Sequence, residues 1–66
     1  MNTKYPKNKV KLTGEDGNAF SILGRVTKAL RKASVSTEER DKFQAEATSG
    51  DYDHLLATAM RWVDVS

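Results

Sequence analysis

Apolar residues recur every three or four positions between residues 20 and 33, and this spacing constrains the fold more than any other feature of the chain. The members of the series are Phe20, Leu23, Val26, Leu30 and Ala33. Since an α-helix has 3.6 residues per turn, the series occupies one side of a helix, which we expect from about Ala19 to about Ala33. Such a helix must bury its apolar side against other elements, and this predicts a compact, mainly α-helical domain.

A capping signal predicts a second helix. Ser36 lies three residues before Glu39, the spacing of a capping box, so we expect a helix over about Thr37 to Thr48. This segment is mostly polar, and Phe43 and Ala47 form its thin apolar seam.

A third helix is expected over about Tyr52 to Trp62, with Asp51 as its N-cap. Gly50 before it suits the left-handed position at the end of the second helix. Asn18 or Asp16 can cap the first helix in the same way as Asp51.

Two short segments alternate polar and apolar residues, as half-buried strands do. The first is Lys9–Thr13, which residues 14–17 follow as a glycine-bracketed turn, and the second is Val63–Val65. The second segment is the available partner for the first. Residues 1–8 are expected to form a flexible basic arm, and residues 9–66 a single small domain of three helices.

The apolar positions of these elements give a predicted core. Its members are Leu12, Phe20, Leu23, Val26, Leu30, Phe43, Leu55, Leu56, Ala59 and Val63. Gly24 lies inside the first helix, where glycine costs about 1 kcal/mol relative to alanine, and a close helix crossing is one reason for its presence.

Length and composition exclude several classes of protein. With 66 residues and no cysteine, the chain is one domain at most and holds no disulfide. There is no apolar run of about 20 residues for a membrane span, and no segment of signal-peptide type. We therefore expect a cytoplasmic protein without membrane attachment.

Catalytic and metal-binding groups are scarce. His54 is the one histidine, and it lies beside Asp51 and Asp53 near the predicted start of the third helix. No second ligand and no nucleophile with a base accompanies it, so we expect a structural role for His54. The sequence therefore predicts no enzyme, no metal or other cofactor, and no small-molecule substrate.

The charge is divided between the two halves of the chain. Residues 1–34 carry a formal charge of +6 and residues 35–66 one of −4, which give the net +2. The basic residues that could follow a phosphate backbone are Lys4, Lys7, Lys9, Lys11, Arg25, Lys28 and Lys32. The alternatives are a solvated helix face and attraction between the two halves. A helix-turn-helix is disfavoured because Glu38, Glu39 and Asp41 would face DNA phosphates.

The last helix carries more apolar residues than one buried face needs. Tyr52, Leu56, Met60 and Trp62 are the candidates for an exposed patch, because small domains leave some apolar area outside their cores. The leading hypothesis is therefore a non-enzymatic module that binds a protein partner or itself. Weak nucleic-acid binding through the basic arm and the basic face of the first helix is the alternative.

Three stretches carry a resemblance. They read LTGEDGNAF from Leu12, GDYDHLL from Gly50 and WVDV from Trp62. With these, residues 10–65 resemble a group of small, uncharacterised proteins of bacterial genomes and their phages or plasmids, for which no function is known. The resemblance implies a bacterial or mobile-element origin and assigns no role to any residue.

Overall fold

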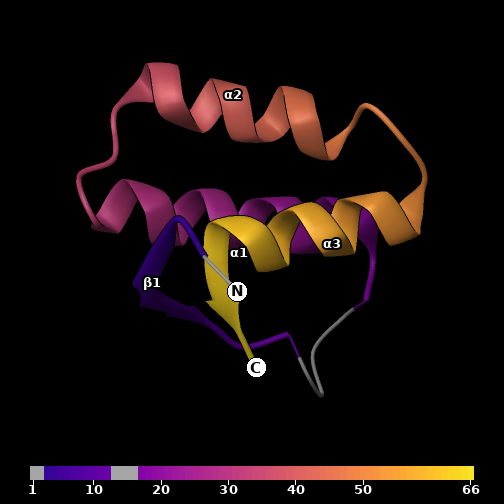
Figure 1. Cartoon of the computed structure of the whole chain (residues 1–66), viewed down its shortest axis with the longest axis horizontal. Coiled ribbons are helices and arrows are strands. Elements are labelled where there is room, and N and C mark those ends of the chain that lie inside the picture. The colour runs from indigo at the N-terminus through magenta and orange to yellow at the C-terminus, as the bar shows by residue number, and fades with distance from the viewer. Residues whose placement is uncertain (1–2, 13–16) are drawn as a thin grey trace.

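The computed structural model describes residues 3–12 and 17–66, and it consists of three helices and a two-stranded sheet (Figure 1). The chain order is β1 (Tyr5–Val10), α1 (Ala19–Lys32), α2 (Thr37–Ala47), α3 (Tyr52–Trp62) and β2 (Val63–Val65). The predicted mainly α, three-helix domain with an N-terminal strand is confirmed. Helix α2 lies along one side of α1 and α3, and the small sheet lies beyond them on the other side.

The helices begin where the capping residues predict. The side chains of Asn18, Ser36 and Asp51 accept backbone N–H bonds at the starts of α1, α2 and α3. These bonds are 2.8, 3.2 and 2.9 Å long. Asp16, the other candidate cap of α1, lies outside the described residues. Local signals thus set all three helix starts.

The left-handed residue is at the end of α1, not at Gly50. Ser34 has φ of 63°, and the N–H groups of Ser34 and Val35 donate to the carbonyls of Arg31 and Leu30. This is a Schellman motif, in which glycine is the usual left-handed residue. Gly50 does not have a positive φ, so that prediction was wrong. Glycine fits there because an added Cβ would lie 2.8 Å from Cγ of His54.

The predicted pairing of the N-terminal strand with Val63–Val65 is confirmed, but its boundaries were wrong. Strand β1 begins at Tyr5, so part of the segment interpreted as a flexible arm is a strand that pairs in parallel with β2. Tyr5 lies opposite Val63, and the next pair along the two strands is Lys9 opposite Asp64. The three intervening residues form a bulge, and this bulge breaks the alternation by which sequence patterns identify strands. Thr13, the predicted end, is not among the described residues.

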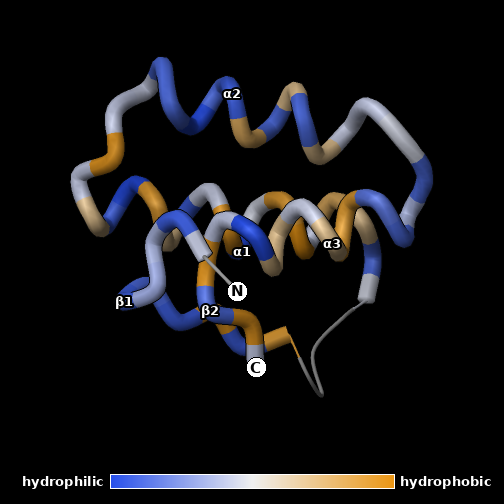
Figure 2. Tube along the Cα trace, viewed as in Figure 1, coloured by the Kyte–Doolittle hydropathy of each residue, from blue (hydrophilic) through white to orange (hydrophobic). Residues whose placement is uncertain are grey.

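The core lies between the three helices and the sheet. Of the predicted members, Leu23, Val26, Leu30, Phe43, Leu55, Ala59 and Val63 are buried, and Leu12 and Leu56 are partly buried. Figure 2 shows that α2 is mostly hydrophilic, whereas β2 contributes the apolar residues Val63 and Val65 on either side of the exposed Asp64.

The burial of two aromatic residues differs from the prediction. Phe20 is 83% exposed, because it lies about 105° around α1 from the centre of the buried side formed by Ile22, Leu23, Val26 and Leu30. Trp62 is only 5% exposed and packs edge-on against Phe43, with 5.5 Å between the ring centroids. The core also contains Val10, Ile22 and Ala47, which the sequence pattern missed.

Candidate functional site

Helix α3 presents a line of apolar side chains outside the core. Tyr52, Leu56 and Met60 follow one another at intervals of four residues, so they lie along one side of the helix. Tyr52 is 43% exposed, Met60 is 59% exposed and Leu56 is partly buried. Trp62, the fourth candidate, belongs to the core, so its assignment to this patch was wrong. Its indole is shielded because β1 covers the end of α3, where Tyr5 stacks obliquely against it.

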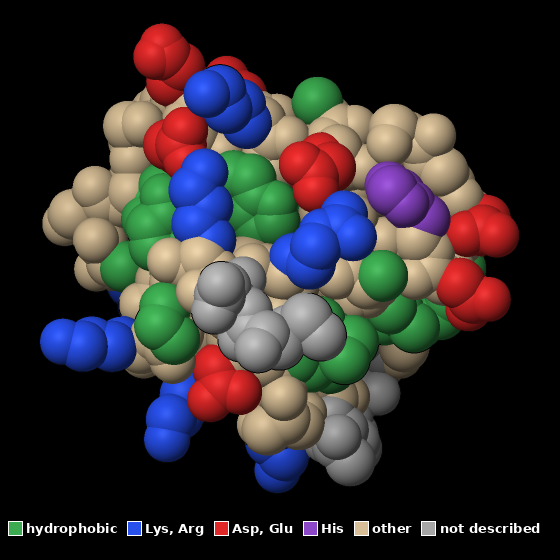
Figure 3. Space-filling view, viewed as in Figure 1, with side chains coloured by type: hydrophobic (Ala, Val, Ile, Leu, Met, Phe, Trp, Pro, Cys, Tyr) green, Lys and Arg blue, Asp and Glu red, His purple; other side chains and the backbone are tan. Residues whose placement is uncertain are grey.

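The line continues onto neighbouring elements. Leu56 and Met60 line a hollow together with Leu12 and Val65, and Tyr52 and Phe20 line another hollow farther along α3. We call Phe20, Tyr52, Leu56, Met60 and Val65 the apolar surface. In Figure 3, hydrophobic side chains gather at the lower right of the face that is drawn.

The hydroxyl of Tyr52 fixes one end of the apolar surface. It donates to the carbonyl of Gly17, and the 2.5 Å bond joins α3 to the residues that precede α1. The ring therefore stands in a defined position while almost half of the side chain remains accessible. A rigid aromatic group with a satisfied hydroxyl is typical of protein interfaces.

Five of the seven basic candidates meet on the side of the molecule formed by β1 and α1. Lys9 and Lys11 flank the buried Val10, so they point to the outer side of the strand. Arg25, Lys28 and Lys32 lie on one side of α1 at intervals of three and four residues. All five line one shallow hollow, whose other lining residues are Val10 and Ala29. We call Lys9, Lys11, Arg25, Lys28 and Lys32 the cationic hollow.

The other two basic candidates lie elsewhere. Lys7 is exposed in the bulge of β1 and does not line the hollow. Lys4 Nζ is 2.7 Å from Glu39 Oε1 and 4.3 Å from the centroid of the Trp62 ring. The hydrogen bond to Glu39 raises the pKa of Lys4, and the same bond lowers the pKa of Glu39. Lys4 therefore links the residue before β1 to α2 and α3 and does not line the cationic hollow.

The acidic residues of α2 do not cover the cationic hollow. Glu39 pairs with Lys4 and Lys42, and Glu46 pairs with Arg61. Among residues 3–12 and 17–66, no ion pair involves Lys9, Lys11, Lys28 or Lys32. The predicted alternative of attraction between the two halves therefore does not hold for these four lysines.

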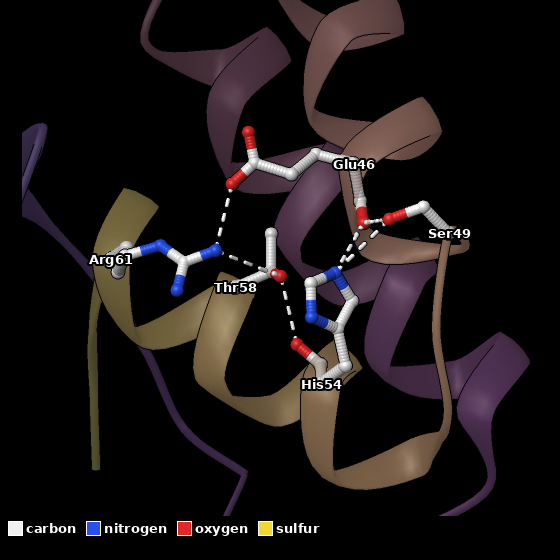
Figure 4. A network of polar contacts seen from close by, with 5 residues as sticks. All are labelled: Glu46, Ser49, His54, Thr58 and Arg61. Atoms are coloured by element: carbon white, nitrogen blue, oxygen red, sulfur yellow. Dashed lines mark hydrogen bonds and ion pairs between the residues drawn. The ribbon is translucent and has the colours of Figure 1, made fainter.

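His54 joins the end of α2 to α3 (Figure 4). Its Nε2 donates to the carbonyl of Glu46 at 2.8 Å and lies 3.1 Å from Oγ of Ser49. Thr58 donates its hydroxyl to the carbonyl of His54, and Arg61 donates to both Thr58 and the carboxylate of Glu46. The bond from Arg61 lowers the pKa of Glu46. This network satisfies the carbonyl of Glu46 near the end of α2, which is a structural role.

The carboxylates near His54 act locally. Asp51 accepts the backbone N–H of His54 as the helix cap, and its side chain does not orient the ring. In the part of the chain that the structure describes, no three histidine or acidic side chains come together as metal ligands. The arrangement around His54 thus offers hydrogen bonds that hold two helices together.

Sequence reasoning wrongly placed Phe20 in the core, and it did not assign Val65 to the apolar surface or predict the meeting of the two basic segments. The signal for Phe20 was its angle around α1, which departs from the mean of the other apolar residues. The signal for Lys9 and Lys11 was their position on both sides of one apolar residue. The sequence pattern does not predict that β1 packs against α1, because this packing depends on the pairing of β1 with β2.

Comparisons with protein-family models, with curated proteins and with solved structures found no match for this chain. Within the described ranges, no helix has both the length and the apolar character that a membrane crossing requires. The case for a function therefore depends on the two surfaces described above.

Proposed function

We propose that this chain is a non-enzymatic interaction module that binds a protein partner or a second copy of itself through the apolar surface. The observation that carries this proposal is the line of Tyr52, Leu56 and Met60 on α3. The neighbouring side of the same helix, about 80° around its axis, fills the core with Leu55 and Ala59. Leu56 is partly buried against the core, whereas the exposed parts of Tyr52 and Met60 are additional to the apolar surface that the fold uses.

The size of the surface sets the strength of such binding. Full burial of one large apolar side chain contributes about 1.5–3 kcal/mol. A stable complex of standard size buries about 800 Å² on each partner, roughly a fifth of the 4435 Å² accessible surface of the chain. A partner must therefore cover the whole apolar surface and part of its polar surroundings, and the complex should be reversible rather than obligate.

We place this interaction in the cytoplasm. A chain without cysteine has no disulfide to stabilise it outside a reducing compartment, and a domain of this size has a small core. Binding of a partner would add to its stability by mass action.

Photo-crosslinking from two positions tests the proposal. Met60 on the apolar surface and Gln44 on the exposed side of α2 are each replaced by p-benzoylphenylalanine, and the chain is expressed in bacterial cells. We expect a crosslinked protein from position 60 and none from position 44. That protein, once purified, should bind the wild-type chain and not Met60→Glu.

Sedimentation velocity distinguishes the second copy from a different partner. If the chain binds itself, the sedimentation coefficient rises with concentration in the wild type and not in Met60→Glu. A strictly monomeric chain that also gives no crosslink specific to position 60 would overturn the proposal.

A further inference from the structure

A second surface, on elements other than those of the apolar surface, has the features of an anion-binding site. In the cationic hollow, Lys9 in β1 and Lys11 just after its end lie on one side, while Arg25, Lys28 and Lys32 of α1 lie on the other. The floor between the two rows is formed by Val10 and Ala29, both small enough to leave it open. A linear anion that lies along this floor would have cations on both sides.

The four lysines of the hollow are not held in ion pairs by the described part of the protein. Lys9, Lys11, Lys28 and Lys32 are exposed and form no ion pair with any described residue. The carboxylates of Glu39 and Glu46 on α2 are held by Lys4, Lys42 and Arg61, none of which lines the hollow. Concentrated positive charge of this kind attracts polyanions and speeds their association.

We propose that the cationic hollow binds the phosphate backbone of double-stranded nucleic acid. Its charge is complementary to a linear polyanion, whose phosphates would meet lysine and arginine side chains from both rows. Neutralised phosphates release their counterions, which supplies most of the free energy of binding that does not depend on sequence.

The residues of the hollow favour a duplex over a single strand. Proteins that hold single strands stack the bases on aromatic side chains. Among the described residues that line the cationic hollow none is aromatic, and the exposed aromatic residues Phe20 and Tyr52 belong to the apolar surface. Contacts are therefore confined to the backbone, and binding should not depend on the base sequence.

The number of phosphates that the hollow neutralises determines how strongly the affinity for a duplex depends on salt concentration. Each neutralised phosphate of a duplex contributes about −0.9 to the slope of log K against log salt concentration, so contacts from the four lysines give about −3.6. Affinity should then fall about 150-fold between 50 and 200 mM salt.

Fluorescence anisotropy tests the proposal with a labelled 24-base-pair duplex, the single strand of the same length, and an unrelated duplex sequence. The variant Lys28→Ala/Lys32→Ala removes two cations from the hollow. The variant Lys7→Ala/Lys42→Ala removes two exposed cations from outside it and serves as the control of equal net charge. Circular dichroism verifies that both variants fold as the wild type does.

We expect both duplexes to bind equally well and more tightly than the single strand. The hollow variant should lower the salt slope by about 2, whereas the control variant should lower it by much less. Equal losses in the two variants would overturn the site, because net charge alone would then explain binding. No duplex binding at 20 mM salt, tighter binding of the single strand, or binding only to vesicles with 30% phosphatidylserine would each overturn the assignment of the ligand.

Discussion

Helices α2 and α3 have the same length of 11 residues, yet they distribute their apolar side chains differently. Helix α2 buries only Phe43 and Ala47 and otherwise presents polar and charged groups to solvent. Helix α3 buries four residues and still exposes Tyr52 and Met60. The difference separates what the fold requires from what it leaves accessible: α2 has just enough apolar surface to dock, whereas α3 has more than the core can cover.

The largest expected loss of stability comes from replacing Phe43, the main buried side chain of α2. Phe43 is fully buried and contacts Trp62, so Phe43→Ala should cost about 3–5 kcal/mol in free energy of unfolding. Met60→Ala on α3 should cost less than about 1 kcal/mol because its side chain is mostly exposed. Urea denaturation of both variants compares them. Similar losses from the two would contradict the division of roles between the helices.

The junction between α2 and α3 gives the next largest effect. A Cβ at position 50 would lie 2.8–3.0 Å from three atoms of His54, so Gly50→Ala must displace the ring from the carbonyl of Glu46. Overpacking of this kind costs about 1–3 kcal/mol. Thermal unfolding of Gly50→Ala, His54→Ala and the double variant forms a double-mutant cycle. If the two losses simply add, the ring is not the source of the strain.

Gly24 in α1 is a position where a substitution should change helix propensity alone, without a change in packing. An added Cβ at Gly24 meets nothing within 4 Å, so the predicted close helix crossing at this residue was wrong. Gly24→Ala should therefore stabilise the protein by about 0.5–1 kcal/mol, the ordinary difference between the two residues in a helix interior. The melting temperature of Gly24→Ala, compared with that of the wild type, measures this gain in stability. A fall in melting temperature would reveal a contact at position 24 that the structure lacks.

The ion pairs of α2 give the smallest effect, which appears in the dependence of stability on pH. Lys4 lowers the pKa of Glu39 in the folded state below the ordinary 4.5. The stabilisation is therefore present above the unfolded pKa and is lost as the pH falls through the folded value, because the unfolded chain takes up the proton first. Both groups are accessible to solvent, so screening keeps the contribution modest.

Urea denaturation between pH 3 and 6 measures this dependence. Lys4→Gln should flatten the loss of stability on acidification, because Glu39 then returns toward its ordinary pKa. Lys28→Gln removes the same charge without contact to Glu39 and should leave the profile unchanged. An unaltered profile in Lys4→Gln would show that this pair adds no stability.

The sequence predicts helix starts well and burial less well, for a physical reason. The caps Asn18, Ser36 and Asp51 act on their own backbone, so a few residues suffice to identify them. Whether Phe20 or Trp62 is buried depends on which neighbours cover each side of the helix, and this is decided by tertiary packing. Only the structure places β1 over Trp62 and leaves Phe20 uncovered.

The apolar surface could be predicted from local sequence, whereas the cationic hollow depends on tertiary packing. Tyr52, Leu56 and Met60 follow from an apolar surplus within one helix, which the sequence displays. The cationic hollow combines residues of β1 with residues of α1, and their meeting depends on the parallel pairing of strands at the two ends of the domain. The bulge between Tyr5 and Lys9 hides that pairing from sequence patterns.

The variant Met60→Glu tests the central claim most directly, when its free energy of unfolding and its crosslinking are measured on the same protein. Leu56 is then replaced by p-benzoylphenylalanine as the crosslinking residue. If the exposed apolar side of α3 serves binding rather than folding, the free energy of unfolding should stay within about 0.5 kcal/mol of the wild type while the crosslink disappears. A loss of several kcal/mol with the crosslink retained would show that this side of α3 belongs to the core.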